Sequence, residues 1–346
     1  MQILDGVIER NELNEKSNGG TELMTEGLVK HVPKEHFEGV QIIVSRQRNE
    51  LLPDKHKIYY SHDLPGDPEA QKILSNNGWA NFHKLVFVSY WQQQHFIEAY
   101  GIPWSKTTVL KNAITPVTVD VKKKFEKKKD QYNIVYHTTP HRGLKLLIPA
   151  FNHLQKNRDD VHLHLYSSFG IYGWEKRDEQ FQQLFEQAKN TPNVTVHKTL
   201  PNEEMKKVLA DMDVFAYPSI WPETSCISLM EAMSAGCLCV HPSYAALPET
   251  SANWTMMYDF HEDEQTHANH FYSFLHHALE YIDNDKNNSS LITKLMGQKS
   301  YVDLYYNWEV RKMEWIGLLT GIKKMELELA GPDNVGFGDA EFSYST

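Results

Sequence analysis

The sequence predicts an α/β protein built from two doubly wound, parallel-sheet domains that face each other across a cleft. The chain has 346 residues, and because ordinary domains hold roughly 100–200 residues, two domains are expected. Short apolar runs alternate with helix-like segments in two series, and such alternation with short connections favours parallel sheets. A basic stretch with almost no core residues lies between the two series.

Residues 1–117 are expected to form the N-terminal domain. Four short apolar runs in it are typical of strands, and polar, helix-permissive segments separate them. These runs lie at 40–45, 57–61, 84–89 and 107–112. The segment before Gly19 offers only a short first strand, so we expect this domain to be somewhat trimmed.

Residues 118–130 are interpreted as an interdomain linker. The run VKKKFEKKKD at 121–130 combines high positive charge with few apolar residues, and charge runs of this kind are usually solvated. A peripheral contact with acidic phospholipid at a membrane surface is the weaker alternative.

Residues 131–298 are expected to form the C-terminal domain. Strands are predicted at 132–138, 161–167, 193–198, 213–218 and 237–242, and helices at 143–155, 175–189 and 202–212. A last amphipathic helix at 299–325 is expected to pack back toward the N-terminal domain, and the acidic tail 326–346 is expected to be mobile. Ligands of such sheets bind beyond the carboxyl ends of the strands, so the loops after the strands are the candidate site.

Composition excludes several functional classes. The chain has 45 acidic and 35 basic residues, a formal net charge of −10, which disfavours nucleic acid as a partner. No apolar run approaches the ~18 residues of a membrane span, and the start MQILDGVIER lacks the regions of a signal peptide. Three cysteines, Cys226, Cys237 and Cys239, favour a reducing compartment over a disulfide scaffold. We therefore expect a cytoplasmic protein.

The segment WPETSCISLMEAMSAGC, residues 221–237, places two glutamates eight positions apart. Glu223 lies in a turn after a predicted strand, and Glu231 lies inside the helix that follows. Thr224 or Ser225 is the expected N-cap of this helix, which is expected to run to Ala235 with Gly236 at its end.

A nucleotide sugar matches this arrangement. The start of a helix offers unpaired N–H groups and the positive end of a dipole, which suit a diphosphate. Carboxylates accept pairs of hydroxyl donors, so one glutamate can hold sugar hydroxyls and the other ribose hydroxyls. Two ordinary surface carboxylates are the alternative on spacing alone.

The same segment, preceded by ADMDVFAYPS, resembles the E-x7-E segment of retaining glycosyltransferases of family 4, which have the GT-B fold. Two further segments are similar to this family: IVYHTTPHRGLKLLIPAF resembles the opening of its second domain, and NGGTE at 18–22 resembles its N-terminal glycine loop. The resemblance implies two Rossmann-like domains and transfer of a sugar from a nucleotide diphosphate with retention of configuration. It implies no resident cofactor and usually no bound metal.

The resemblance also assigns roles to individual residues. Arg142 stands where the family has a phosphate-binding basic residue before a glycine, and a guanidinium there can stabilise the leaving diphosphate. His137 stands where a second arginine is common, and a histidine is charged only part of the time near pH 7. Glu223 is expected at the reacting sugar and Glu231 at the ribose.

The remaining expected contacts come from both domains. Gly19 and Gly20 allow close approach of the backbone to a phosphate or sugar, although a glycine pair also suits any turn. His62 follows a predicted strand and is expected near the reacting sugar, with an ordinary loop histidine as the alternative. The helix start contributes four residues expected at the diphosphate: Thr224, Ser225, Cys226 and Ile227.

The expected function is therefore that of a metal-independent, hexosyltransferase-like retaining glycosyltransferase acting on a hydroxyl acceptor: a glycan, a lipid-linked sugar or a protein-linked sugar. The alternatives are another GT-B enzyme, such as an epimerase or a phosphorylase, and a non-catalytic protein that binds nucleotide sugars. The sequence DMD at 211–213 matches a metal-binding pattern, but it precedes an apolar strand instead of following one, which disfavours a metal site.

Overall fold

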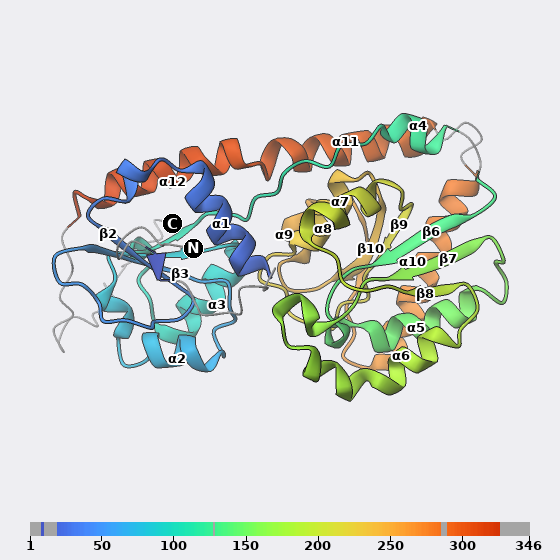
Figure 1. Ribbon diagram of the computed structural model, residues 1–346, viewed down its shortest axis with the longest axis horizontal. Coiled ribbons are helices and arrows are strands. Elements are labelled where there is room, and N and C mark those ends of the chain that lie inside the picture. The colour runs from blue at the N-terminus through green and yellow to red at the C-terminus, as the bar shows by residue number, and fades with distance from the viewer. Residues whose placement is uncertain (1–7, 10–18, 127–128, 285–288, 326–346) are drawn as a thin grey trace, which may run out of the picture.

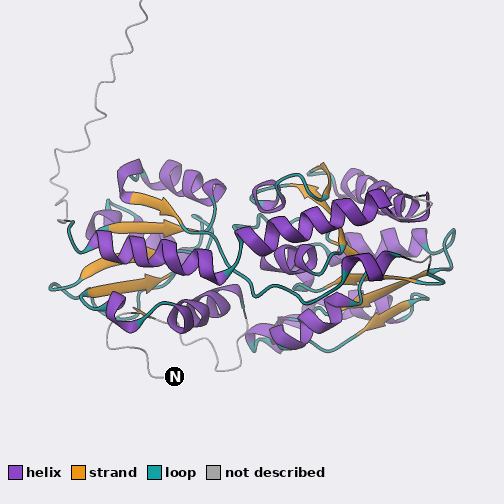
Figure 2. Cartoon of the chain, turned by 90° about the horizontal axis from the view of Figure 1, so that it is seen from above, coloured by secondary structure: helices purple, strands orange, loops and turns teal. Residues whose placement is uncertain are grey.

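Each half of the chain forms one parallel β-sheet, and the two halves lie side by side as separate lobes (Figure 1). The computed structural model describes residues 8–9, 19–126, 129–284 and 289–325. Figure 2 shows helices on both sides of the strands in each lobe. The predicted fold class, two Rossmann-like domains with parallel sheets, is confirmed. The predicted tail 326–346 lies outside the described residues.

The N-terminal sheet has five strands whose spatial order follows the chain. They are β1 (Ile8–Glu9), β2 (Val40–Val44), β3 (His56–Tyr60), β4 (Lys84–Phe87) and β5 (Thr107–Val109), with helices α1 (Gly20–His31), α2 (Pro68–Leu74) and α3 (Tyr90–Tyr100). Alternate residues of the strands point to opposite faces. Ile42 therefore packs in the cluster with α1, and Ile43 packs in the cluster with α2 and α3. Both faces are buried, which explains the continuous apolar runs.

The C-terminal sheet has six strands in the order β11-β10-β9-β6-β7-β8. They are β6 (Tyr132–Tyr136), β7 (Val161–Leu165), β8 (Val194–Val196), β9 (Val214–Ala216), β10 (Leu238–Ser243) and β11 (Met256–Asp259). The chain moves outward in one direction from β6 and in the other from β9. Ligands of open α/β sheets bind at such a reversal, so the loops after β6 and β9 define the expected site. The sequence did not indicate β11.

Helices cover both faces of this sheet. They are α5 (Leu144–Leu154), α6 (Gln182–Lys189), α7 (Asn202–Ala210), α8 (Ile227–Ser234), α9 (Leu247–Ser251) and α10 (Glu264–Asn284). The predicted helix at 175–189 starts differently from the prediction, because its first turns, Glu175–Phe181, form a 3-10 helix before α6 begins.

Residues 121–126 and 129 of the basic segment are in part packed on the C-terminal domain, where the sequence predicted a solvated linker. Val121 and Phe125 belong to the short helix α4 (Val121–Phe125) and are buried in the C-terminal core. The ammonium group of Lys124 donates to the carbonyl oxygen of Ala235 at 3.0 Å, and Lys129 pairs with Asp213. Two apolar residues at helical spacing therefore attach the segment to the domain, and two of its lysines serve internal contacts.

The single helix predicted at 299–325 is also wrong. Two helices, α11 (Ser289–Tyr305) and α12 (Trp308–Ile322), occupy this part of the chain. They separate because the side chain of Asn307 caps α12 by accepting from the N–H of Val310 at 2.9 Å. In Figure 1, α11 runs along the C-terminal lobe and α12 along the N-terminal lobe. Trp315 of α12 is buried in the N-terminal core, so the chain returns to its first domain.

Glu249 of α9 joins the two lobes beside this crossing. Its two carboxylate oxygens accept from the N–H groups of Tyr90 and Trp91, at 3.0 Å and 3.1 Å, at the start of α3. Lys111 pairs with the same carboxylate. A negative group at a helix N-terminus is favourable. This contact therefore helps to hold the C-terminal lobe against the N-terminal lobe.

Candidate active site

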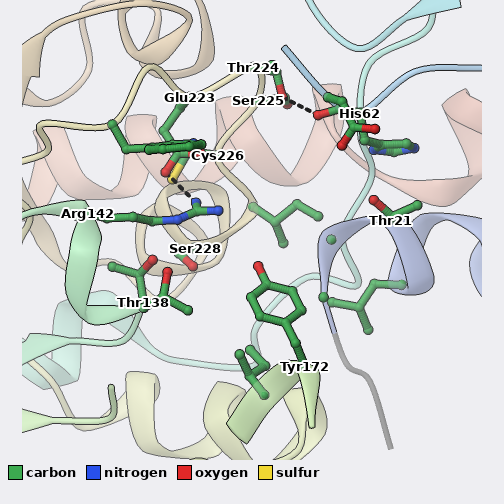
Figure 3. Close-up of a pocket in the computed structure, with 18 of the residues that line it drawn as sticks. Thr21, His62, Thr138, Arg142, Tyr172, Glu223, Thr224, Ser225, Cys226 and Ser228 are labelled. Atoms are coloured by element: carbon green, nitrogen blue, oxygen red, sulfur yellow. Dashed lines mark hydrogen bonds and ion pairs between the residues drawn. The ribbon is translucent and has the colours of Figure 1, made fainter. Parts of the chain in front are cut away.

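A cavity of about 1170 Å³ lies between the lobes, and residues of both domains line it. All the residues predicted from the sequence line this one cavity: Gly19, Gly20, His62, His137, Arg142, Glu223, Thr224, Ser225, Cys226, Ile227 and Glu231. Figure 3 shows Arg142 and Glu223 on the C-terminal side, with Thr21 and His62 on the N-terminal side. The fold therefore brings together residues that are more than two hundred positions apart in the sequence.

Gly143 explains why the loops after β6 and β9 can meet. Its φ is +144°, and a Cβ at this position would collide with the carbonyl oxygen of Pro218. The close approach allows the N–H of Ile220 to donate to the carbonyl oxygen of Arg142 at 3.0 Å. Only a glycine combines this conformation with this contact. The fold therefore requires a glycine after Arg142, because only then can the arginine approach the loop that carries Glu223.

Arg142 and Glu223 form a buried ion pair. The guanidinium Nη1 lies 2.5 Å from Oε1 of Glu223, and the hydroxyl of Tyr217 donates to the same oxygen. Burial opposes the charge on Arg142, but the nearby carboxylate outweighs it and holds the pKa of Arg142 well above its usual range. The Nε atom of Arg142 is buried without a partner among the described residues, so the guanidinium retains a donor for a ligand.

Tyr217 was not predicted as a site residue. It lies just after β9 (Val214–Ala216), in a run that reads only as apolar core. Its position at the end of a buried strand could have identified it as a site residue, because buried tyrosine hydroxyls usually find a partner. The partner itself was not evident from the sequence.

Helix α8 begins one or two residues later than predicted. Its N-cap is Cys226, which makes no side-chain capping bond, and its first residue is Ile227. Thr224 does not cap the helix, because its hydroxyl donates across the cavity mouth to the carbonyl oxygen of His62 at 2.9 Å (Figure 3). Without a side-chain cap, the positive end of the helix remains oriented toward the cavity that Cys226 and Ile227 line.

Glu231 lies about one turn after the start of α8. It lines the cavity and is only 4% exposed. Burial raises the pKa of its carboxyl to about 7, although a hydrogen bond from Asn202 opposes this rise. That bond joins Nδ2 of Asn202 to Oε1 of Glu231 at 2.7 Å. Sequence reasoning missed Asn202, which opens α7 and had the appearance of an ordinary helix-start residue.

The two predicted histidines are uncharged near neutral pH. Burial lowers the pKa of His137 to about 4 and the pKa of His62 to about 3. The expectation that His137 is charged part of the time near pH 7 is therefore wrong, because the imidazole is desolvated. Both Nε2 atoms are buried without a partner among the described residues, so each ring can form one neutral hydrogen bond with a ligand.

The N-terminal glycines lie against the C-terminal lobe. A Cβ on Gly19 would collide with the ring of Tyr172, and a Cβ on Gly20 would lie 3.3 Å from Cδ1 of Ile227. Gly19 is the N-cap of α1, so the start of this helix faces the start of α8. Tyr172 was not predicted, and nothing in the sequence linked it to a glycine 153 positions earlier.

The described residues contain no group of three or more His, Cys, Asp or Glu side chains placed to hold a metal ion. Asp213 of the DMD sequence is fully buried. One of its carboxylate oxygens pairs with Lys129, and the other accepts from the N–H of Asn133 at 2.9 Å. Its carboxylate therefore serves the fold.

Among the described residues, no helix has the length and apolar character needed to span a membrane.

The two parallel-sheet domains with a cavity between them have the GT-B arrangement. Residues 118–286, just under half of the chain, match the family model described as glycosyl transferases group 1. No curated protein sequence matches the chain.

Solved structures show the same fold at low sequence identity. A glycosyltransferase from Rickettsia africae ESF-5 has a TM-score of 0.65 and 16% identity, over 92% of this chain and 84% of its own. HepE from Anabaena, solved with UDP-glucose, has a TM-score of 0.60 and 14% identity, over 85% and 82%. WaaG, a glycosyltransferase involved in lipopolysaccharide biosynthesis, has a TM-score of 0.59 and 15% identity, over 83% and 80%.

Proposed function

We propose that the protein is a retaining hexosyltransferase of family 4, which moves a sugar from a nucleoside diphosphate sugar to an acceptor hydroxyl without a metal. The observation that carries the proposal is the buried Arg142–Glu223 pair at the strand-order reversal, open to a cavity between two domains. Burying two charges costs several kcal/mol per ion in desolvation, and both groups line the space where ligands of this fold class bind.

The diphosphate is placed against Arg142 and the start of α8. The unpartnered Nε of Arg142 and the positive end of the uncapped helix both favour an anion. The protonated thiol of Cys226 adds no negative charge there, because burial raises the pKa of Cys226. This arrangement favours the diphosphate as a leaving group, since it stabilises the charge that develops as the sugar departs.

The ribose is placed at Glu231 and the sugar at Glu223. Glu231 and Asn202 together offer acceptors and a donor for two neighbouring hydroxyls. The carboxylate of Glu223, held by Arg142 and Tyr217, is oriented to accept from hydroxyls of the sugar. The unpartnered imidazole nitrogen of His62 approaches from the other lobe.

In the reaction, the bond from the anomeric carbon to the diphosphate oxygen breaks and a bond to the acceptor oxygen forms on the same face. The acceptor proton passes to the departing phosphate oxygen. No protein nucleophile is required, and the two lobes exclude water from the donor.

The described cysteines are free and buried, which supports the reducing, cytoplasmic location expected from the sequence.

The test is nucleotide release and product analysis with UDP-, GDP- and ADP-hexoses, starting with UDP-glucose because HepE was solved with it. We expect release that EDTA does not abolish and a product with retained anomeric configuration by NMR. Glu223→Gln is expected to lower release about 10²–10³-fold while UDP still binds. Glu203→Gln, an exposed carboxylate on α7, is the matched control.

The outcomes separate the alternatives. An inverted product contradicts the retaining mechanism, and loss of release in EDTA contradicts metal independence. UDP binding without release from any donor identifies a non-catalytic nucleotide-sugar protein. Interconversion of the donor sugar without transfer identifies an epimerase.

A further inference from the structure

The cavity is larger than a single small-molecule site requires. Such sites typically measure roughly 300–1,000 Å³, whereas this cavity measures about 1170 Å³. The donor proposed above uses the part near Arg142, α8 and Glu231. The remaining part is lined by Trp221 and by the segment that follows β7, where only Tyr172 has so far been given a contact.

A row of rings, which we term the aromatic wall, lines this remaining part from the C-terminal lobe. It consists of Trp221, His141, Phe169 and Trp174. His141 stands edge-on to Trp221 at 4.8 Å between ring centres and stacks on Phe169 at 5.1 Å. Trp221 is 39% exposed and immediately precedes the loop of Glu223. The wall therefore begins beside the reacting sugar and leads away from it.

The guanidinium of Arg177 lies against this wall. It stands 4.2 Å from the ring centre of Trp174 and 6.0 Å from that of Phe169. No carboxylate pairs with it among the described residues, because the neighbouring Asp178 accepts from Ser168 and from the N–H of Phe169 instead. Stacking on rings fixes the planar group while its N–H donors stay available.

A second arginine faces the cavity from the N-terminal lobe. Arg46 follows β2 and lines the cavity. It is near enough to Asp63 to oppose the rise that burial causes in the pKa of that carboxyl. In a chain with net charge −10, Arg177 and Arg46 place positive charge in the cavity beyond the diphosphate site.

We propose that the acceptor is an anionic saccharide, whose ring packs on the aromatic wall and whose phosphate or carboxylate binds Arg177, with Arg46 facing it from the other lobe. A pyranose ring presents C–H groups on its faces and hydroxyls at its edge, which suits a flat aromatic surface. A guanidinium binds phosphate or carboxylate through paired N–H donors. This inference rests on the proposed function, since it names the class of acceptor for the same site.

The test measures binding of four probes to the full chain in the presence of UDP by ligand-observed NMR titration. The probes are glucose, glucose 6-phosphate, glucuronic acid and inorganic phosphate. We expect at least one charged sugar to bind about tenfold more tightly than both glucose and inorganic phosphate. Arg177→Gln is expected to remove that advantage and to leave UDP binding unchanged. Lys176→Gln, which removes an exposed charge one residue away that does not line the cavity, is expected to keep it.

Each result decides the proposal. Preference for the phosphorylated or for the carboxylated sugar supports it and identifies the group. Equal binding of glucose and the charged sugars, or a preference that Arg177→Gln leaves intact, overturns it. Inorganic phosphate binding as tightly as glucose 6-phosphate overturns the role of the ring. Failure of UDP to bind the wild-type chain contradicts the proposed function separately, because the four probes are ranked against one another and not against UDP.

Discussion

The two walls of the cavity differ in how they are prepared for a ligand. The C-terminal wall holds the ion pair of Arg142 and Glu223 and the hydrogen-bonded carboxyl of Glu231. The N-terminal wall near the donor presents the backbone of Gly19 and the neutral ring of His62. The C-terminal wall therefore offers charged groups to a ligand, whereas the N-terminal wall offers backbone and a neutral ring.

This difference follows from topology. The C-terminal sheet reverses its strand order between β6 and β9, so two adjacent loops point into one space and can exchange charged contacts. The N-terminal sheet has strands in sequential order, and its helix α1 reaches the cavity by its glycine-containing start. We therefore expect substitutions in the C-terminal wall to change donor binding, and substitutions in the N-terminal wall to change transfer alone.

The largest effect is expected from Arg142→Gln. The substitution leaves Glu223 buried without its cation, which should destabilise the protein by about 3–5 kcal/mol and lower nucleotide release by about 10²–10³-fold. Urea unfolding and the release assay measure the two effects. The double variant Arg142→Gln, Glu223→Gln should regain most of the stability but none of the activity. A double variant as unstable as the single one contradicts the buried pair.

Glu231→Ala tests the other end of the same wall. Loss of the carboxylate acceptor at the ribose should weaken UDP binding roughly 10–100-fold, since a hydrogen bond to a charged group is worth about 1.5–3 kcal/mol. Isothermal titration calorimetry at pH 8 measures the affinity, and the thermal shift caused by UDP should largely disappear. Glu203→Ala, which removes an exposed carboxylate on α7, is the control. Unchanged UDP affinity in Glu231→Ala contradicts the ribose assignment.

The sequence predicted the residues that one local segment carries and missed some of their contacts from other parts of the chain. Glu223 and Glu231 lie in a single strand–loop–helix segment, so their neighbourhood in the chain is also their neighbourhood in space. Asn202 reaches Glu231 from another helix, and Tyr172 reaches Gly19 from the other domain. Such pairings depend on how the elements pack, which periodicity and turn signals do not encode.

Helix boundaries failed for a related reason. The N-cap of α8 was expected at Thr224 or Ser225 because these residue types cap helices well, but the hydroxyl of Thr224 donates to the carbonyl oxygen of His62 in the other lobe. Asn307 reads as one polar residue within an amphipathic run, yet its side chain starts a new helix. In both places a tertiary requirement outweighed the local preference.

Gly19→Ala tests the N-terminal wall. The added Cβ would collide with the ring of Tyr172, so the lobes should no longer approach as closely. We expect transfer to fall about tenfold, as misplacement at a distance from the chemistry lowers rate, while UDP affinity stays unchanged. Gly66→Ala is the matched control, because Gly66 also lines the cavity and has open space where a Cβ would lie. Weakened UDP binding in Gly19→Ala contradicts the division between the walls.

The smallest effect is expected in the pH dependence of stability, and it concerns the protonation of Glu231. In the folded chain burial raises the pKa of this carboxyl from 4.5 to about 7. Between these values the unfolded chain binds fewer protons than the folded chain, so the contribution of Glu231 to stability falls as pH rises and levels off above pH 7. Glu231→Gln has no such titration. The difference in unfolding free energy between wild type and Glu231→Gln should therefore shift by about 1 kcal/mol between pH 5 and pH 6, with the wild type losing stability.

Urea unfolding at pH 5 and pH 6 measures this shift, and a difference that stays constant means that Glu231 is already ionised at pH 5. The C-terminal wall would then hold a second fixed charge, in place of a carboxyl that ionises as the ribose hydroxyls bind.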